Sequence, residues 1–312
     1  MTKIMPEEKN EVKMNYNEIQ IVGMRKNKDL KIVITIIILA IIGIIASVGI
    51  IVFNQVSADK ALEASTNVTD TTSGGENTTV VTATTIEEEE KASAEKQQFI
   101  EAIDNIYNGQ EGKRVFLTFD DGPTKEVTPK VLDVLKKYNV KATFFVLGNR
   151  VKANPDILKR AYEEGHYIAN HSYSHKYSSI YKSANSVLAE YNKTEDAIRE
   201  ALGDANYSSN LFRFPGGSYG GPYEKVKKKA RAELKKQAIA YLDWSALTYD
   251  AEGANTTKKI LKNLKETMNG WNNVVILMHD AADKCITYES LEDVIKYLQK
   301  EGYAFKNIYD LM

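Results

Sequence analysis

The sequence has few of the residues that most often build metal and redox sites. Its 312 residues include one cysteine, Cys285, and four histidines. A single cysteine excludes an intramolecular disulfide framework, and it excludes zinc or iron–sulfur sites made of several cysteines. A transition metal would therefore have to take its ligands mainly from the histidines and the carboxylates.

The chain also lacks an excess of charge of either sign. Lys and Arg together number 41, against 42 for Asp and Glu, so the formal net charge is -1. A domain that binds nucleic acid usually carries a strong basic surplus, because it contacts phosphates. The balance of charges therefore argues against nucleic acid as a partner.

One segment lacks charge altogether. Residues 32–53 contain no charged side chain and eleven isoleucines. A helix of this length spans about 33 Å, at ~1.5 Å per residue, which is enough to cross a bilayer core. The positive-inside rule places the N-terminus in the cytoplasm, because basic residues precede the run at Arg25, Lys26, Lys28 and Lys31. A cleaved signal peptide is the alternative, with Val56-Ser57-Ala58 as the small-residue cleavage site.

The predicted transmembrane helix divides the chain into parts. Residues 1–31 form a cytoplasmic segment, and residues 54–96 are rich in Thr and Glu. Such a composition buries too little apolar surface to fold alone and indicates an extracellular linker or stalk. A lead-in helix is expected over residues 97–113, followed by one folded domain over 114–312.

From residue 114 onward, short apolar runs alternate with amphipathic helical stretches. Strands are expected at 115–119, 142–146, 167–169, 211–214, 239–242 and 274–278. Helices are expected at 128–138, 155–164, 184–202, 223–237, 257–268 and 291–300. This alternation predicts an α/β fold of parallel βα units, either closed as a barrel or open as a doubly wound sheet. In both architectures functional groups gather at the C-terminal ends of the strands.

Titratable residues follow three of these expected strands. Asp120 and Asp121 follow the first strand, His171 and His175 follow the third, and His279 ends the last. Two histidines four residues apart can reach one ion from a single turn or tight loop. A carboxylate from Asp120 or Asp121 would complete a set of two histidines and one carboxylate. That set is typical of hydrolytic zinc sites and of non-haem iron sites.

Further polar groups lie near the later strand ends. Arg213 is a permanent cation that can orient a carboxylate. The turn at 215–217 contains two glycines, which allow a substrate to approach the backbone amides closely. Asp243, before Trp244, could orient a histidine and raise its basicity. His166 precedes the third strand and is expected to be structural.

Five blocks of sequence occur in a characteristic order. They are TFDDGP (118–123), NHSYSH (170–175), RFPGGS (213–218), DWS (243–245) and ILMHD (276–280). In type, order and spacing they resemble the motifs of the polysaccharide deacetylase family, the NodB-homology domain of carbohydrate esterase family 4. The resemblance covers residues 114–309. It implies a distorted (β/α) barrel of about seven parallel strands that removes N-acetyl groups from polymeric amino sugars.

The resemblance also implies a metal site and a base. Asp121, His171 and His175 are expected to bind a divalent metal, most often zinc in this family, with cobalt or another divalent ion as the alternative. Asp120 is expected to be the general base that takes a proton from the attacking water. Arg213 is expected to keep Asp120 ionised and correctly oriented.

The remaining roles concern the acetyl group and the leaving amine. The Gly216 amide is expected to stabilise the oxyanion, and His279, held by Asp243, to protonate the amine. Trp244 and Leu277 are expected to line the acetyl pocket. The chain departs from the family in one respect, since many members have tyrosine where Gly216 stands, and sugar contacts made by that ring are absent.

Together, the predicted anchor and the resemblance indicate a bacterial cell-envelope enzyme on the outer face of the membrane. The expected reaction is removal of acetate from N-acetylglucosamine in peptidoglycan, which implies a wall more resistant to lysozyme. N-acetylmuramic acid, chitooligosaccharide and acetyl xylan are the alternative substrates. A wall-binding homologue with little activity is the alternative from a different functional class.

Overall fold

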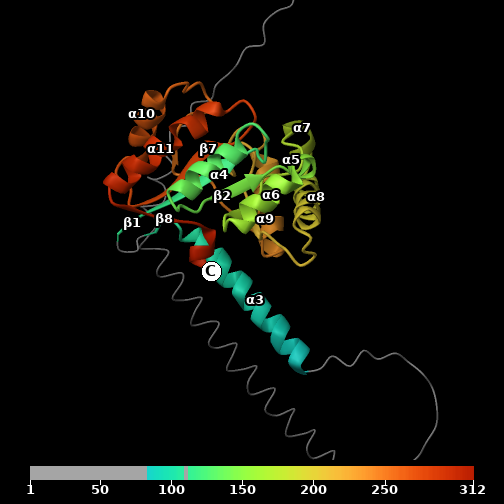
Figure 1. Ribbon diagram of the computed structural model, residues 1–312. Helices are drawn as coiled ribbons and strands as arrows, with labels where there is room; N and C mark the ends of the chain where they lie inside the picture. The colour runs from blue at the N-terminus through green and yellow to red at the C-terminus, as the bar shows by residue number, and fades with distance from the viewer. Residues whose placement is uncertain (1–82, 109–111) are drawn as a thin grey trace, which may run out of the picture. The chain divides into compact units, whose positions relative to one another are not determined.

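The computed structural model describes residues 83–108 and 112–312 (Figure 1). The predicted cytoplasmic segment, the predicted transmembrane helix and most of the predicted linker lie outside these residues. Among the helices that the structure describes, none is both long enough and apolar enough to cross a membrane.

A parallel sheet forms the centre of the domain, with strand order β5-β4-β3-β2-β1-β7-β6. These strands are β1 (Lys113–Asp120), β2 (Thr143–Val146), β3 (Tyr167–Asn170), β4 (Leu211–Phe212), β5 (Ala240–Tyr241), β6 (Ala246–Leu247) and β7 (Asn273–His279). β8 (Tyr303–Lys306) pairs with residues 113–116 of β1. β2 pairs with residues 118–120 on the same edge of β1. No pairing joins β5 to β6 among the described strands, so the sheet is a half-barrel. The prediction of about seven parallel strands is confirmed.

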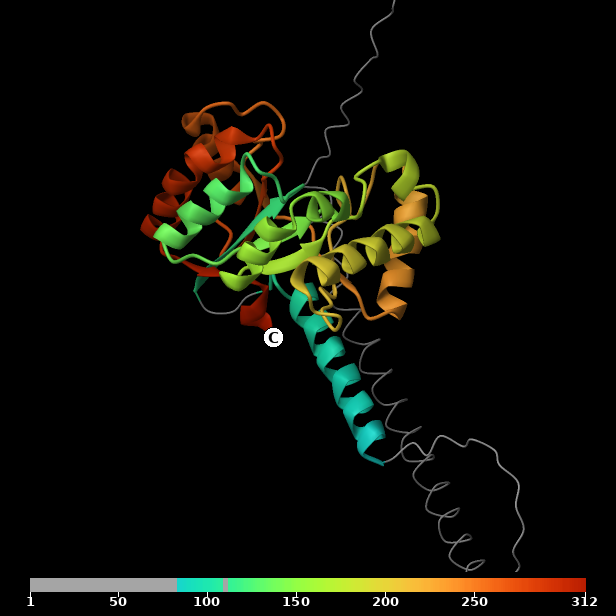
Figure 2. The ribbon, with the colours of Figure 1, turned by 45° about the vertical axis from the view of Figure 1, so that its right-hand side comes forward.

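Helices surround the sheet, as Figures 1 and 2 show. They are α3 (Ala83–Asp104), α4 (Thr128–Lys137), α5 (Gly148–Ala153), α6 (Pro155–Glu163), α7 (Tyr177–Ile180), α8 (Ala184–Leu202), α9 (Glu224–Lys236), α10 (Thr257–Met268) and α11 (Cys285–Lys300), with the 3₁₀ helix η1 (Ile308–Leu311) at the end. On the outside, neighbours contact one another in the order α9, α8, α6, α4, α11, α10. α8 and α10 have the predicted bounds, whereas α5, α7, β6 and β8 were not predicted.

Local sequence signals explain several helix ends. α8 begins after Ser183, whose side chain accepts a hydrogen bond from the backbone of Ser186, and it ends at Gly203, which has a φ of +68°. α4 and α6 each have a proline in their first turn, Pro129 and Pro155. Proline is tolerated there because the first helical N–H groups have no intrahelical acceptor. These signals are why the predicted and observed bounds of α4, α6 and α8 agree within one residue, whereas α11 begins at Cys285 instead of residue 291.

Alternation along the strands separates two cores. In β1, Val115, Leu117 and Phe119 pack outward against the helices, whereas Phe116 packs inside the barrel. Successive side chains of a strand point to opposite faces, so Asp120 also points inward. β7 follows the same alternation, and the register places Asp120 opposite His279. Two titratable side chains therefore lie side by side at the same mouth of the barrel.

The last turns of α3 close the opposite end of the barrel. Phe99, Ile100 and Ile103 are buried in one cluster with inward residues of the sheet, including Phe116 and Val275. The helix begins at Ala83, earlier than the predicted start at residue 97, and ends at Asp104. The last turns of α3 are thus part of the folded core.

We expect the substitution Ile103→Ala to destabilise the protein. The side chain is 2% exposed, and removing such a group from a core costs about 2–5 kcal/mol of unfolding free energy. Lys96→Ala, on the exposed part of α3, is the matched control and should change this free energy by less than about 0.5 kcal/mol. Urea denaturation measures both. Equal stability of the two variants would show that α3 does not belong to the core.

Candidate active site

A buried arginine lies at the centre of the barrel mouth. The Arg213 side chain is fully buried, with its guanidinium 3.8 Å from the centre of the Phe145 ring. One terminal nitrogen donates to Asp120 Oδ1 at 2.8 Å and to Thr118 Oγ1 at 2.7 Å. The predicted pairing of Arg213 with Asp120 is therefore present in the structure.

Backbone carbonyls accept from the rest of the guanidinium. Nε of Arg213 donates to the carbonyl of Leu242 at 3.0 Å, and the second terminal nitrogen donates to the carbonyl of Asp243 at 3.1 Å. Burial raises the pKa of Asp120, while the charges of Arg213 and His279 oppose that shift. A carboxylate whose pKa is raised towards neutrality is a better general base than an ordinary aspartate.

Asp121, His171 and His175 converge next to this pair. Asp121 Oδ1 lies 3.7 Å from Nε2 of His171 and 3.5 Å from Nε2 of His175. One ligand atom from each of the three residues lies within 4.8 Å of the other two. Asp120 is also close, with Oδ2 at 3.6 Å from Nε2 of His171, but its other oxygen is bonded to Arg213. The structure thus favours Asp121 as the carboxylate of the set.

The atoms that converge here fit a bound cation. Nδ1 of His171 is 2.8 Å from the carbonyl of Arg213, and a carbonyl only accepts, so Nδ1 carries the proton and Nε2 presents a lone pair. Burial lowers the pKa of His171 to about 3, so the ring is neutral. Asp121 Oδ1 is buried without a hydrogen-bond partner. A carboxylate facing an imidazole lone pair is stabilised by a divalent metal, and two histidines with one carboxylate suit zinc.

The loop that carries the two histidines has an unusual backbone and a specific support. Ser172 and His175 have positive φ values of +73° and +55°, which most residues avoid. Glu190, from α8, accepts hydrogen bonds from the backbone of Tyr173 at 2.9 Å and of Ser174 at 2.7 Å. Sequence reasoning missed Glu190, because nothing in a helical pattern shows that one polar side chain reaches a distant loop.

Asp280 supports the loop that carries Asp120 and Asp121. Its carboxylate accepts from Thr128 at 2.6 Å, its N–H donates to the Asp120 carbonyl at 3.0 Å, and its carbonyl accepts from Thr124 at 2.7 Å. Burial raises the pKa of Asp280 to about 7. These hydrogen bonds connect the C-terminal ends of β1 and β7.

His279 is paired with a carboxylate that the sequence did not single out. Its Nδ1 donates to Asp250 Oδ1 at 2.9 Å and its backbone N–H donates to Oδ2 at 2.7 Å. Thr287 donates to the same carboxylate at 2.7 Å. Burial alone would lower the pKa of His279, but the hydrogen bond to Asp250 and the negative charges nearby raise it to about 9. His279 is therefore a protonated imidazole at neutral pH.

The prediction that Asp243 holds His279 is wrong. The Asp243 carboxylate accepts from the N–H of Ser218 at 2.9 Å and from its hydroxyl at 2.6 Å, so it secures the glycine-containing turn instead. Burial raises the pKa of Asp243. Asp250 was missed because the strand before it, β6, is two residues long and too short to show alternation. A usable sequence signal was the position of Asp250, an acidic residue three positions after the apolar pair Ala246-Leu247.

The other predicted substrate residues lie around the same mouth. Gly216 is exposed, has a φ of +71°, and its N–H makes no hydrogen bond among those recorded for the described residues. Trp244 lies beside Gly217, since a Cβ on Gly217 would be 3.6 Å from the indole. Leu277 is 5% exposed and precedes His279 by two residues in β7, so it faces inward. These positions are compatible with the predicted acetyl pocket.

His166 lies outside this group. Its Nδ1 accepts a hydrogen bond from the N–H of Ala142 at 3.1 Å, and its ring packs edge-on against Phe144. Burial lowers the pKa of His166 to about 4. It is a neutral side chain within the core.

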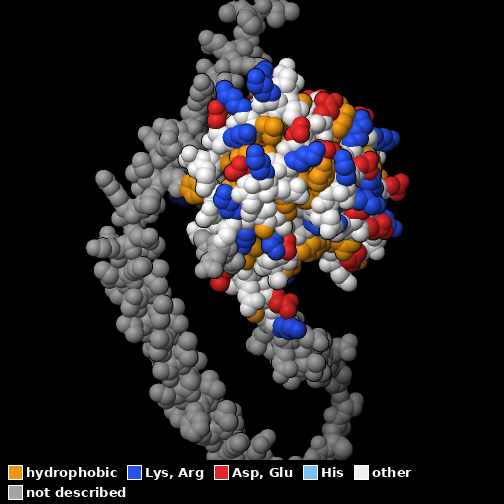
Figure 3. All heavy atoms as spheres, turned by 60° about the vertical axis from the view of Figure 1, so that its left-hand side comes forward, with side chains coloured by type: hydrophobic (Ala, Val, Ile, Leu, Met, Phe, Trp, Pro, Cys, Tyr) orange, Lys and Arg blue, Asp and Glu red, His pale blue; other side chains and the backbone are white. Residues whose placement is uncertain are grey.

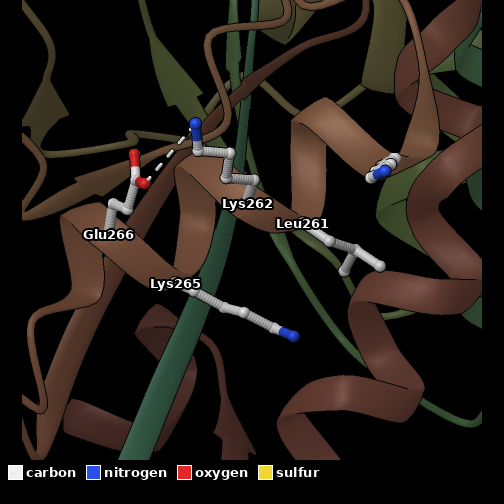
Figure 4. Close-up of a pocket in the computed structure, with 5 residues that line it drawn as sticks. Leu261, Lys262, Lys265 and Glu266 are labelled. Carbon is white, nitrogen blue, oxygen red and sulfur yellow. Dashed lines mark ion pairs between the residues drawn. The ribbon is translucent and has the colours of Figure 1, made fainter.

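Two other surface features of the described residues differ from the barrel mouth. On the face in Figure 3, basic and acidic side chains are interspersed. A cavity of about 480 Å³ is lined by residues of α10 alone: Lys258, Leu261, Lys262, Lys265 and Glu266. Figure 4 shows Lys262 paired with Glu266, at 3.8 Å. No strand-end residue lines that cavity.

We expect Asp121→Asn to lower the affinity for Zn²⁺ at least about 100-fold, more than the ~10–100-fold typical for residues that only support a ligand. The amide loses the charge that offsets the cation. Isothermal titration of the metal-free protein with Zn²⁺ measures the affinity. Asp196→Asn, whose side chain is 71% exposed, is the matched control and should bind as the wild type does. Unchanged binding by Asp121→Asn would exclude this residue as a ligand.

This chain is similar to a family model and to several known proteins. The family model for polysaccharide deacetylase matches residues 107–235. The peptidoglycan-N-acetylglucosamine deacetylase PgdA of Listeria monocytogenes is 35% identical over 212 residues, which are 67% of this chain and 41% of that protein. The chain thus spans less than half the length of that relative.

Two further proteins are matched over most of their length. The peptidoglycan-N-acetylmuramic acid deacetylase PdaA of Bacillus subtilis is 32% identical over 229 residues, 71% of this chain and 80% of that protein. A crystallised CE4 esterase of Streptococcus mutans superposes with a TM-score of 0.61 at 34% identity, covering 67% of this chain and 90% of the esterase. The fold agrees as well, so this chain belongs to the polysaccharide deacetylase family, carbohydrate esterase family 4.

Proposed function

We propose that this protein hydrolyses the N-acetyl groups of N-acetylglucosamine residues in peptidoglycan and releases acetate. One observation carries the proposal. A buried carboxylate, Asp120, and a protonated imidazole, His279, lie opposite each other in register on β1 and β7, beside the set of Asp121, His171 and His175. Hydrolysis of an amide needs a base for the attacking water and an acid for the departing amine, and both are present.

The first step uses the base and the polarised acetyl group. When bound, a divalent cation such as Zn²⁺ polarises the acetyl carbonyl and lowers the pKa of a coordinated water. Asp120 accepts the proton of the attacking water through the oxygen that is not bonded to Arg213. The Gly216 N–H donates a hydrogen bond to the oxygen that becomes negative, and such donors act most strongly where water is excluded.

The second step uses the acid. His279 donates its Nε2 proton to the sugar nitrogen as the carbon–nitrogen bond breaks, and acetate and a free amine remain. Asp250 fixes the orientation of the imidazole through Nδ1 and keeps the ring protonated. Arg213 holds Asp120 in place through both steps because its other hydrogen bonds are made to the rigid barrel wall.

The choice of amino sugar rests on relatives that act on the same polymer. Listeria monocytogenes PgdA, by its name, acts on N-acetylglucosamine, and Bacillus subtilis PdaA acts on N-acetylmuramic acid. We place N-acetylglucosamine first and N-acetylmuramic acid second. Peptidoglycan also suits the predicted location, since we propose that residues 32–53 anchor the chain in the membrane with the catalytic domain on the wall side. A deacetylated wall would resist lysozyme.

We expect the full-length protein, loaded with Zn²⁺, to release acetate from purified peptidoglycan. Removal of the metal with a chelator should abolish release, and added Zn²⁺ or Co²⁺ should restore it. Mass analysis of the muropeptides identifies the sugar that lost its acetyl group, with a loss of about 42 Da expected on glucosamine because the acetyl group, C₂H₃O, is replaced by one hydrogen. Loss on muramic acid would select the second substrate, and binding of peptidoglycan without acetate release would indicate a wall-binding protein.

We expect Asp250→Asn to move the alkaline limit of activity downward. A general acid must be protonated, so kcat/KM falls as the pH rises through the pKa of His279, which is about 9 in the wild type. Without the carboxylate this limit should move towards the ordinary histidine value of about 6.5, and the maximal rate should fall on the order of 10²-fold. Asp293→Asn, exposed on α11, should keep the wild-type profile. An unmoved alkaline limit in Asp250→Asn would exclude His279 as the acid.

A further inference from the structure

Tyr177 lies at the mouth of the site, although neither the motifs nor the mechanism use it. It is the first residue of α7, two positions after His175, and it is 39% exposed. The centre of its ring is 5.6 Å from the centre of the His175 ring. The ring therefore borders the metal-ligand set on the open side of the barrel.

The hydroxyl of Tyr177 occupies the space above Gly216. A Cβ on Gly216 would lie 2.6 Å from Tyr177 Oη, which is closer than real Cβ contacts allow. Any side chain at position 216 would have to displace the phenol. The glycine and the tyrosine are thus complementary, because the absence of a side chain on the turn makes room for a ring supplied by α7.

Neighbouring aromatic side chains hold the Tyr177 ring in place. Tyr181 and Tyr223 pack against it edge-on, with ring centres 5.7 and 6.1 Å away. The Tyr181 hydroxyl donates to the carbonyl of Pro215 at 2.6 Å, and Nζ of Lys227 donates to the carbonyl of Gly216 at 3.3 Å. The ring and the turn are therefore positioned by the same set of contacts.

The phenol hydroxyl itself is free to bind a ligand. No hydrogen bond to it is recorded among the described residues, although the Tyr181 hydroxyl beside it is bonded. A fixed ring with an unused donor at its tip suits a carbohydrate, which offers hydroxyl groups and apolar C–H faces.

We propose that Tyr177 is a substrate-binding residue whose hydroxyl hydrogen-bonds the sugar that carries the scissile acetamide. The inference rests on the proposed function and adds a specificity-determining contact to it. If the ring served only to pack against His175 and Tyr181, phenylalanine would replace tyrosine without loss. If the hydroxyl binds the sugar, phenylalanine leaves a sugar hydroxyl without its partner and weakens substrate binding.

The test compares three full-length, zinc-loaded proteins: the wild type, Tyr177→Phe and the control Tyr309→Phe. Tyr309 is also exposed, at 42%, but it belongs to η1 and packs on Tyr167, away from the strand C-termini. Acetate release from N-acetylglucosamine tetramers gives kcat and KM separately. Calorimetric titration gives the affinity for the same tetramer, and a Zn²⁺ titration checks the metal site.

We expect Tyr177→Phe to raise KM and weaken tetramer binding by about tenfold, with kcat changed less than twofold and with Zn²⁺ affinity unchanged. Tyr309→Phe should match the wild type in all four measurements. Wild-type values in Tyr177→Phe would overturn the inference. A loss of Zn²⁺ affinity would also overturn it, because the ring would then only support His175, and so would a loss confined to kcat. A wild type that releases no acetate from purified peptidoglycan would instead contradict the proposed function.

Discussion

The buried ion pair between Arg213 and Asp120 decides which of two adjacent aspartates can face His171 and His175. Both side chains are buried, and removing one partner of such a pair costs about 3–5 kcal/mol because the other charge is left unpaired. The guanidinium lies over Phe145 and donates to Thr118 and to two backbone carbonyls, so Asp120 is joined to the inner wall of the barrel. One Asp120 oxygen is thereby occupied, which leaves Asp121 as the carboxylate free to face the two histidines. The ion pair thus gives the two adjacent aspartates, Asp120 and Asp121, different partners.

The parallel sheet brings the other residues of the site close to this ion pair. Asp120 and His279 are opposite in the register of β1 and β7, and His171 follows β3 on the same side. Each group has its own support: Arg213 for Asp120, Asp250 for His279, and Glu190 for the loop that carries the histidines. The two histidines have different proton affinities, because burial lowers the pKa of His171 whereas the hydrogen bond to Asp250 and nearby negative charges raise the pKa of His279. One residue type thereby supplies a neutral imidazole beside Asp121 and a charged imidazole opposite Asp120.

Much of this arrangement could be predicted from the sequence, for reasons that differ between residues. Five titratable residues lie at the ends of recognisable strands or in the loops that follow them, so strand-end reasoning brings them together. They are Asp120, Asp121, His171, His175 and His279. Asp250 and Glu190 could not be found in this way, because the first follows a strand of two residues and the second reaches the site from the middle of α8. The resemblance of the DWS block to a family motif implies that Asp243 holds His279, but only the folded chain shows that its partner is Ser218. Tyr177 was missed because its importance depends on the empty space at Gly216.

The most direct measurement is a crystal structure of the zinc-loaded protein, with anomalous scattering at the zinc edge used to locate the ion. The account predicts one strong peak bounded by Asp121, His171 and His175, with Asp120 still bonded to Arg213. A peak that includes Asp120 as a ligand, with Arg213 released from it, would contradict the central claim that the buried ion pair keeps the base apart from the metal. A peak elsewhere in the protein would contradict the metal site itself.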